Sequence, residues 1–182
     1  MRIIAGRFRG SILASPGRGD ASASLRPTSD RVRESLFSTL THRGVIEGAR
    51  VLDVFAGTGA LGLEALSRGA REVCFVEHGR VALRLLAKNQ QRLRVEKQTF
   101  VMRSDARRLG TWSNAPFDLV FLDPPYGRDL GQIALQRLRD GGWLSPCAFV
   151  AWEENAPMTP PDGFECIETR RFGSTHVTLM TA

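Results

Sequence analysis

Short apolar segments alternate with amphipathic segments along most of this chain. The apolar segments are rich in Val, Leu, Ile and Phe, which is typical of buried strands. The segments between them carry good helix formers with apolar residues at helical spacing. This alternation predicts an α/β fold with a mostly parallel sheet. Strands are predicted near 50–55 and at 72–77, 99–103, 117–122 and 146–152, and helices at 60–68, 79–94 and 129–139.

A further helix is predicted before the first of these strands. Thr28 or Ser29 is placed to cap it. Apolar positions recur at i, i+4, i+5 and i+8 from Val32, so this face is expected to pack on the domain. Arg31 and Arg33 are then expected to point elsewhere, toward solvent or substrate.

Further β-rich segments lie at the two ends of the chain. The segments 164–172 and 175–181 are separated by Gly173-Ser174, a pattern that predicts a hairpin. Near the start, glycines at positions such as Gly6 mark turns between short strands, and a flexible tip is expected around 16–24.

The tetrapeptide Asp123-Pro124-Pro125-Tyr126 directly follows the predicted strand 117–122. Two prolines must end that strand, because proline fixes φ and cannot donate to a sheet ladder. We therefore expect a rigid loop at the carboxyl end of a strand, where open α/β sheets bind ligands. Its carboxylate, its unclaimed backbone carbonyl and its aromatic ring suit the holding of a flat ring that bears an amine. An ordinary turn whose Tyr packs on the core is the alternative.

A second candidate site lies upstream, where Asp53-Val54-Phe55-Ala56 runs into Gly57-Thr58-Gly59. Strand, glycine turn and helix follow one another, and glycine lets the backbone approach a ligand closely. The strand 72–77 then ends in Glu77, 24 residues after Asp53. A carboxylate at that position can accept hydrogen bonds from a ribose diol.

The glycine turn also matches a complete G-x-G-x-x-G, so a nicotinamide-binding domain has to be weighed. Asp53, inside the strand before the glycines, would repel a pyrophosphate but not a cationic cofactor or one that bears an amino acid. No obvious hydride-transfer site follows. The pattern therefore favours S-adenosylmethionine over a dinucleotide, and a structural βαβ unit without ligand stays open.

The order D-x-F-A-G-T-G, V-E-H, S-D-A and D-P-P-Y resembles class I S-adenosylmethionine-dependent amino methyltransferases. The sequence R-I-I-A-G from Arg2 and R-P-T-S-D-R-V-R-E-S-L-F from Arg26 narrow the resemblance to the RsmD family of 16S ribosomal RNA guanine-N2 methyltransferases, over essentially the whole chain. The resemblance implies a seven-stranded Rossmann-like fold and methylation of guanine 966 in a partly assembled small subunit. One departure is Phe172-Gly173-Ser174-Thr175, where Y-G-D-T is expected; this turn is expected to touch neither pocket.

The motifs and the resemblance together predict two sets of site residues. By resemblance, Asp105 accepts a hydrogen bond from the adenine amine, although it also suits the cap of a short helix. The predicted catalytic residues are Asp123, Pro124, Pro125 and Tyr126, and the predicted cofactor-binding residues are Asp53, Phe55, Ala56, Gly57, Thr58, Gly59, Glu77, His78, Asp105 and Ala106.

The chain carries a formal net charge of +6, and most of it lies in the first quarter. Residues 1–43 hold eight arginines against three acids, which gives +5. We expect this part to be a basic arm and helix that contacts RNA and covers the cofactor site, and 44–182 to be the methyltransferase domain. A solvated basic face is the alternative. The predicted RNA-binding residues are Arg2, Arg7, Arg9, Arg26, Arg31 and Arg33.

Other features narrow the class of protein. No apolar run is long enough to cross a bilayer and no secretory h-region is present, so a cytoplasmic location is expected. Cys74, Cys147 and Cys166 lack metal-site spacing, so neither a metal nor a disulfide is expected. The expected partner is 16S ribosomal RNA or the assembling small subunit, with the protein as a monomer. A DNA adenine-N6 methyltransferase, a protein-glutamine methyltransferase and a non-catalytic RNA-binding assembly factor remain as alternatives.

Overall fold

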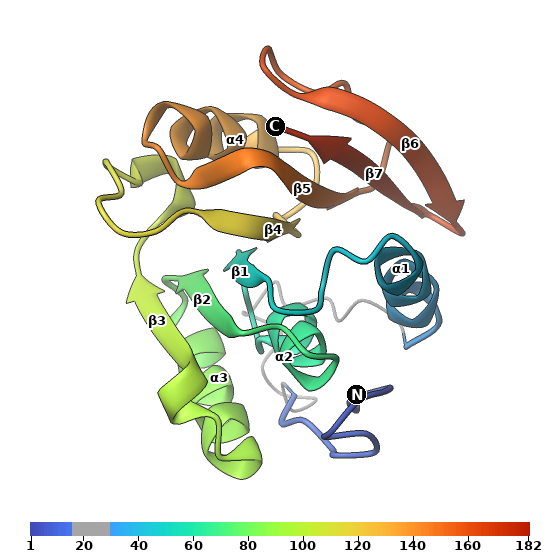
Figure 1. Cartoon of the computed structure of the whole chain (residues 1–182), viewed down its shortest axis with the longest axis vertical. Coiled ribbons are helices and arrows are strands. Elements are labelled where there is room, and N and C mark those ends of the chain that lie inside the picture. The colour runs from blue at the N-terminus through green and yellow to red at the C-terminus, as the bar shows by residue number, and fades with distance from the viewer. Residues whose placement is uncertain (16–29) are drawn as a thin grey trace.

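One seven-stranded sheet runs through the computed structural model, which describes residues 1–15 and 30–182 (Figure 1). Its order is β3-β2-β1-β4-β5-β7-β6, with the first five strands parallel and β7 antiparallel to both its neighbours. The predicted mostly parallel sheet with a C-terminal hairpin is confirmed. The strands are β1 (Arg50–Val54), β2 (Glu72–Glu77), β3 (Thr99–Arg103), β4 (Phe117–Leu122), β5 (Leu144–Glu154), β6 (Glu165–Phe172) and β7 (Thr175–Thr181).

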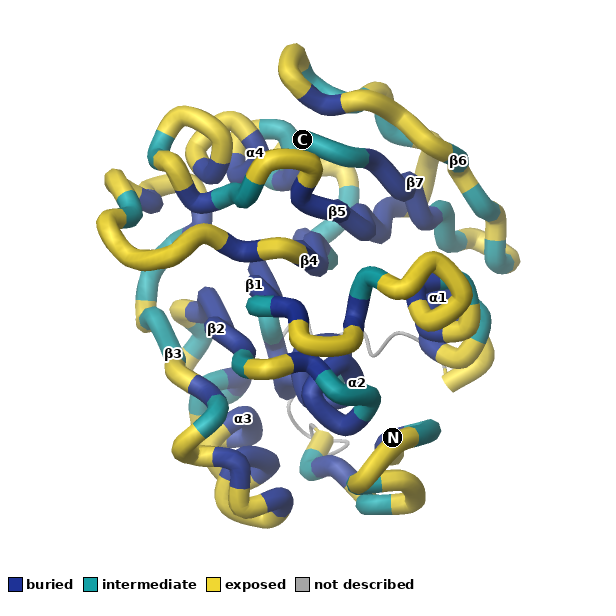
Figure 2. Tube along the Cα trace, viewed as in Figure 1, coloured by how far each residue is buried: buried dark blue, intermediate teal, exposed yellow. Residues whose placement is uncertain are grey.

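Helices cover both faces of this sheet. Successive side chains of a strand point to opposite faces, so Val51 of β1 lies in one buried cluster with residues of α1, α2 and α3, whereas Leu52 lies in a second with residues of α4. Figure 2 shows the resulting buried layer along β1 and β2. The helices are α1 (Asp30–His42), α2 (Ala60–Ser67), α3 (Arg80–Leu93) and α4 (Leu130–Asp140), with 3₁₀ helices η1 (Glu96–Gln98) and η2 (Ala106–Arg108).

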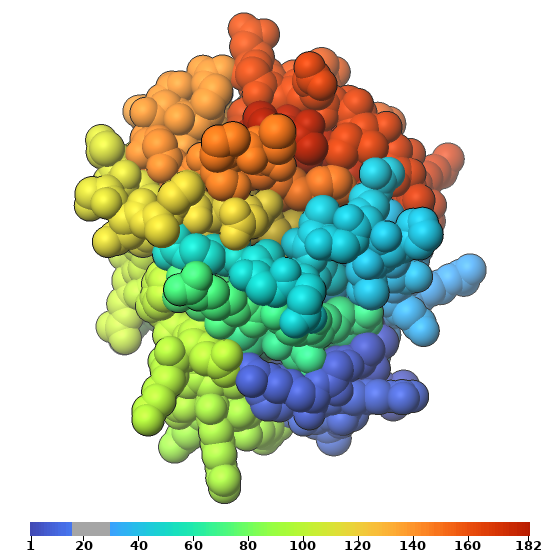
Figure 3. Space-filling model, viewed as in Figure 1, coloured from blue at the N-terminus to red at the C-terminus, as the bar shows by residue number. Residues whose placement is uncertain are grey.

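Residues 1–15 are docked on α2 (Figure 3). The Glu64 carboxylate accepts the backbone N–H groups of Ile4 and Ala5 at 2.7 and 3.1 Å. Ser67 accepts from two more backbone donors of this segment. The short strands predicted here are therefore reduced to one isolated bridge, Arg2 with Ile12, because α2 takes the donors that a strand pair would use.

The buried side chain of Asn89, on α3, joins the N-terminal segment to the glycine turn. Its Oδ1 accepts from Ala14 N at 2.7 Å, and its Nδ2 donates to Thr58 O at 2.9 Å. A fully buried amide stays in place only when its hydrogen bonds are made. The position of Ala14 is thereby tied to the backbone that follows β1.

Arg33 differs from its prediction, because its side chain is fully buried. Its Nη2 donates to Arg2 O and to Asp30 Oδ1, both at 2.7 Å, and its Nη1 lies 3.9 Å from Glu64 Oε2. The expectation that Arg33 points toward solvent or substrate is wrong, and this placement leaves its guanidinium no surface for RNA. Arg31 is exposed. The predicted tip at 16–24, the cap at Thr28 or Ser29 and the predicted RNA contact Arg26 lie outside the described residues.

The strand β5 extends beyond the predicted 146–152 at both ends. At its start the register against β4 shifts between Phe117 and Leu119, which lets a positive φ at Cys147 occur within the strand. At its far end Glu153 and Glu154 pair with residues of β7 and are buried. The neighbouring β7 supplies the ladder that continues the strand to Glu154.

Candidate active site

The ends of three adjacent strands bring the two predicted pockets together. Val54, which ends β1, pairs with Leu122 of β4 and with Val76 of β2. Asp123 N approaches Val54 O at 3.5 Å, and Ala56 N donates to Val76 O at 3.2 Å. The glycine turn and the D-P-P-Y loop therefore lie side by side at the carboxyl edge of the sheet, where α/β folds bind ligands, and together form one candidate site.

Glu77 organises the half that follows β1. Its Oε2 accepts from Gly57 N at 2.8 Å, and its Oε1 accepts from the backbone N–H groups of His78 and Gly79 at 2.7 and 2.6 Å. A carboxylate has about four acceptor sites, so Oε2 retains one for a hydroxyl. The arrangement fits one hydroxyl of a ribose diol without disturbing the turn. A second hydroxyl would have to replace a backbone donor.

The glycine turn adopts backbone conformations that side chains tolerate poorly. Gly59 has a φ of +78°, and a Cβ there would lie 2.4 Å from Leu86 Cδ1. Phe55, the first residue after β1, has a φ of 63° despite its bulky side chain. Such a residue costs on the order of 1–3 kcal/mol and is concentrated at ligand sites. The strain at Phe55 therefore agrees with a binding role for the turn.

Asp53 lies beneath the turn and only 2% of it is exposed. Its Oδ2 accepts from Gly62 N at 2.8 Å, which ties β1 to the first turn of α2. Burial raises the pKa of Asp53 to about 8, the bond from Gly62 opposes this, and the charge of Glu77 adds to it. Burial thus favours the protonated carboxyl, which weakens the repulsion of pyrophosphate that was inferred from the sequence. Asp53 supports the turn from below.

Asp105 follows β3 and caps η2, as one of its two predicted roles requires. Its Oδ1 accepts from Arg107 N at 2.9 Å, and its Oδ2 lies 2.5 Å from Arg107 Nη2. The hydrogen bond from the Arg107 side chain holds the pKa of Asp105 far below its usual range. Because the carboxylate is ionised and partly exposed, it can accept a hydrogen bond from a ligand amine in place of one from water. Ala106 is buried beneath it, and the His78 side chain is mostly exposed.

The D-P-P-Y loop follows β4 as expected, and Tyr126 contacts two other strands. Its hydroxyl donates to Glu153 Oε1, at the end of β5, at 2.8 Å. Thr175, the first residue of β7, hydrogen-bonds to the same phenol and lowers its pKa. The expectation that the turn 172–175 touches neither pocket is therefore wrong. The insertion of β7 beside β5 brings this turn to the site.

Glu153 and Thr175 are the site residues that the sequence did not indicate. A pair of glutamates after an apolar strand resembles a solvated strand end. Glu153 could have been recognised only from its position, because β5 ends at the same edge of the sheet as β4. The strand order was needed to recognise it.

The basic residues of the N-terminal segment lie at the surface. Arg2, Arg7 and Arg9 are exposed. The Arg7 guanidinium lies 4.4 Å from the Phe8 ring centroid, and its Nη2 donates to Gln98 Oε1 at 2.6 Å. These side chains are accessible to an anionic partner.

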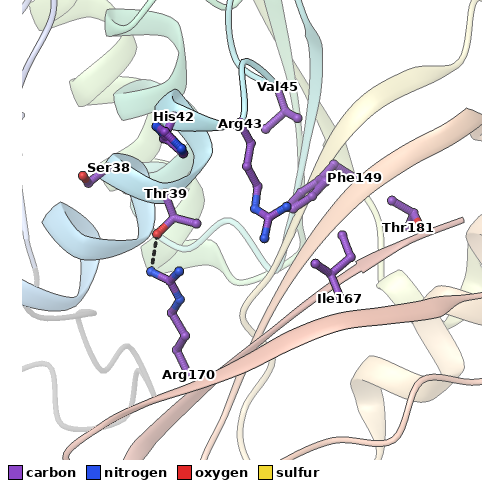
Figure 4. Close-up of a pocket in the computed structure, with 9 residues that line it drawn as sticks. All are labelled: Ser38, Thr39, His42, Arg43, Val45, Phe149, Ile167, Arg170 and Thr181. Carbon is purple, nitrogen blue, oxygen red and sulfur yellow. Dashed lines mark hydrogen bonds between the residues drawn. The ribbon is translucent and has the colours of Figure 1, made fainter.

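A separate groove of about 800 Å³ lies between α1 and the strands β5, β6 and β7 (Figure 4). Arg43 and Arg170 face it, and both pair with Glu168. None of the predicted site residues that the structure describes lines this groove. Its residues are Ser38, Thr39, His42, Arg43, Val45, Phe149, Ile167, Arg170 and Thr181.

Within the described ranges, no group of three or more His, Cys, Asp or Glu side chains could hold a metal ion. The same part of the chain contains no helix long and apolar enough to cross a membrane.

A seven-stranded sheet of this order, with a glycine turn after β1, an acid ending β2 and D-P-P-Y after β4, defines a class I methyltransferase. Residues 1–181 match the model of the family described as conserved hypothetical protein 95. The chain belongs to this family, the RsmD family of methyltransferases.

Named relatives and a solved structure agree with this assignment. The ribosomal RNA small subunit methyltransferase D of Haemophilus influenzae is 38% identical over 181 residues, covering 95% of this chain and 89% of that protein. The Escherichia coli K12 protein of the same name is 42% identical over 164 residues, covering 88% and 79%. The structure of Escherichia coli yhhF matches with a TM-score of 0.83 at 38% identity, covering 100% of this chain and 97% of that one.

Proposed function

We propose that this chain transfers a methyl group from S-adenosylmethionine to the exocyclic N2 of a guanine in 16S ribosomal RNA. The acceptor expected for the family is guanine 966 in an assembling small subunit. Relatives called ribosomal RNA small subunit methyltransferase D support this class of substrate. The observation that carries the proposal is the approach of Asp123 N to Val54 O at 3.5 Å. It places the D-P-P-Y loop, which suits an amine, next to the glycine turn, which suits a nucleoside.

S-adenosylmethionine supplies a methyl group bonded to a positively charged sulfur. In the proposed complex, Glu77 Oε2 accepts from a ribose hydroxyl, and Asp105 accepts from the adenine amine. Gly57 and Gly59 let the backbone approach the amino-acid part of the cofactor. The carboxylates along this edge of the sheet also favour a cationic ligand.

The guanine amine is a poor nucleophile, because its lone pair is delocalised into the ring. Its two N–H groups donate to the Asp123 carboxylate and the Pro124 carbonyl, which localises the lone pair. The negative charge of Asp123 stabilises the positive charge that develops on nitrogen. The nitrogen–carbon bond forms as the carbon–sulfur bond breaks, and one amine proton leaves to solvent. Tyr126 stacks on the base, which must leave its own stack to enter the site.

The test is transfer of labelled methyl from S-adenosylmethionine to small subunits from a strain that lacks this gene. Free 16S RNA and duplex DNA are tested alongside. We expect label in one guanine of the ribosomal RNA, at N2. Label in DNA alone would instead indicate an adenine-N6 methyltransferase. RNA binding without cofactor binding or label would indicate a non-catalytic assembly factor.

A further inference from the structure

The buried carboxylate of Glu153 holds the phenol of Tyr126 from outside the D-P-P-Y loop. The hydrogen bond measures 2.8 Å, and Glu153 is only 5% exposed. A bond to a charged acceptor is stronger than one between neutral groups. Glu153 belongs to β5 and directly follows Trp152, which pairs with Leu122 at the end of β4. The orientation of the tyrosine is therefore set by the neighbouring strand of the sheet.

The hairpin contributes a second contact to the same phenol. Burial raises the pKa of Tyr126, and the negative charge of Glu153 raises it further, whereas the hydrogen bond with Thr175 lowers it. The net pKa lies above the ordinary value for tyrosine. Glu153 and Thr175 thus act on one oxygen atom from β5 and β7.

The loop itself does not fix the ring. Pro124 and Pro125 restrict the backbone before Tyr126, and Gly127 follows with a φ of +70°. Neither constraint determines the two side-chain torsions of Tyr126, which choose among staggered rotamers. A displacement of about 1 Å in a reacting group can cost about 10²-fold in rate. A contact that selects one rotamer therefore has a direct kinetic consequence.

We propose that Glu153, with Thr175, is a positioning residue for methyl transfer. It holds the Tyr126 ring in the orientation against which the acceptor base stacks. This inference rests on the proposed function. The chemical groups that touch the base remain Asp123, Pro124 and Tyr126.

The kinetic test compares Glu153→Gln, Tyr126→Phe and the double variant in methyl transfer to small subunits. Each single variant should lower kcat about tenfold, because Tyr126→Phe removes the hydrogen bond and Glu153→Gln replaces its charged acceptor with a weaker neutral one. The double variant should be no slower than the slower single variant. Cofactor affinity should stay within about twofold, since the network does not reach the glycine turn. Thr175→Val should lower kcat, and Thr175→Ser should restore it.

The matched control is Glu154→Gln. Glu154 is the next residue of β5, is 3% exposed, and accepts from Asn155 N at 2.9 Å. Because successive side chains of a strand alternate in direction, this carboxylate lies away from Tyr126. Its substitution should leave kcat unchanged and should report any general effect of removing a buried charge from the end of β5.

A second readout is independent of activity, because Tyr126 is the only tyrosine in the chain. Tyrosinate absorbance after a rapid pH jump therefore reports this residue alone. Glu153→Gln should lower the pKa of Tyr126 and Thr175→Val should raise it, whereas Glu154→Gln should leave it unchanged. A merely structural role for Glu153 would not produce these opposite shifts.

An active wild-type protein with full-rate Glu153→Gln and Tyr126→Phe variants would overturn the positioning role and leave the proposed function intact. Singly slow variants whose effects multiply in the double variant would also overturn it. Wild-type protein that transfers no methyl group to ribosomal RNA would overturn the function and the positioning role together.

Discussion

Asp123 is the residue on which the proposed chemistry depends most directly. We expect Asp123→Ala to lower turnover by at least about 10²-fold, because it removes both an acceptor for the amine and the charge that stabilises the transition state. Cofactor affinity should stay within a few-fold, since the proposed ribose contact Glu77 ends β2 and the proposed adenine contact Asp105 follows β3. Methyl incorporation gives the turnover and calorimetry gives the affinity.

The control for Asp123 is an acid of the same loop. Asp129 is exposed and has a positive φ, which asparagine tolerates. Asp129→Asn should keep full turnover, whereas Asp123→Asn should be severely slow. Equal rates for the two variants would remove Asp123 from the mechanism.

The raised pKa of Asp53 predicts how the stability of the protein changes with pH. Folding raises its pKa from the ordinary 3.8 to about 8, so the native state holds a proton that the unfolded chain releases. The stability contributed by this proton is complete below about pH 4 and is lost as pH rises through about 8. Asp53→Asn cannot ionise, so its advantage over wild type in unfolding free energy should grow across this range. Urea unfolding at pH 5 and pH 8.5 measures it, and parallel curves for the two proteins would contradict it.

Single residues also show which parts of the candidate site the sequence could predict. Asp123 and Glu77 could be placed because each follows an apolar strand at the edge where ligands bind. The charge of Asp53 could not be inferred, because its burial depends on how α2 packs over β1. Arg33 was placed outward by helical periodicity, but Glu64 and the backbone of Arg2 draw it inward.

At the scale of elements, α2 is the support of the N-terminal segment. Glu64 accepts two backbone donors of that segment, bonds to Arg68 and lies beside the buried Arg33. Glu64→Ala should destabilise the protein by about 3–5 kcal/mol, because it leaves a buried charge uncompensated. Chemical denaturation gives the free energy, and hydrogen exchange of Ile4 and Ala5 amides should accelerate.

Glu34→Ala is the comparison for this effect. Glu34 is an exposed acid next to Arg33 in sequence. A surface substitution of this kind changes stability by less than about 0.5 kcal/mol. Comparable losses from the two variants would mean that the α2 contacts are not what hold the segment.

Most elements could be predicted because local chemistry defines their ends. Pro124 and Pro125 stop β4, and Gly69 follows the last turn of α2. The N-terminal strands were overpredicted because the donors of residues 4, 5, 7 and 8 go to Glu64 and Ser67, which are remote in sequence. The far end of β5 was missed because its ladder is supplied by β7.

At the scale of the whole molecule, the exposed arginines of the N-terminal segment predict salt-dependent binding. Each phosphate that an arginine neutralises adds about one to the slope of log affinity against log salt. The double variant Arg7→Gln/Arg9→Gln should therefore bind 16S RNA more weakly and with a slope lower by about two. Filter binding across a potassium chloride series measures this.

A double variant on the opposite face of the sheet serves as the reference. Arg108 and Arg137 are exposed on η2 and α4. Arg108→Gln/Arg137→Gln removes the same amount of charge from a different place. It therefore separates the effect of where the arginines lie from the effect of net charge. An equal fall in slope for both double variants would mean that RNA responds to overall charge and not to the N-terminal segment.

The insertion of β7 between β5 and β6 sets an order of assembly. Strand β6 is made before β7, yet it has no sheet neighbour except β7. It therefore stays unpaired until β7 has been made, and the two strands can then pair as a hairpin whose other edge, along β7, docks on β5. The glycine turn needs only the β1–α2–β2 unit, whose contacts are close in sequence and form early. The glycine turn, which is proposed to bind the cofactor, can thus form first. The contacts of Tyr126 are completed when β7 brings Thr175 to the site.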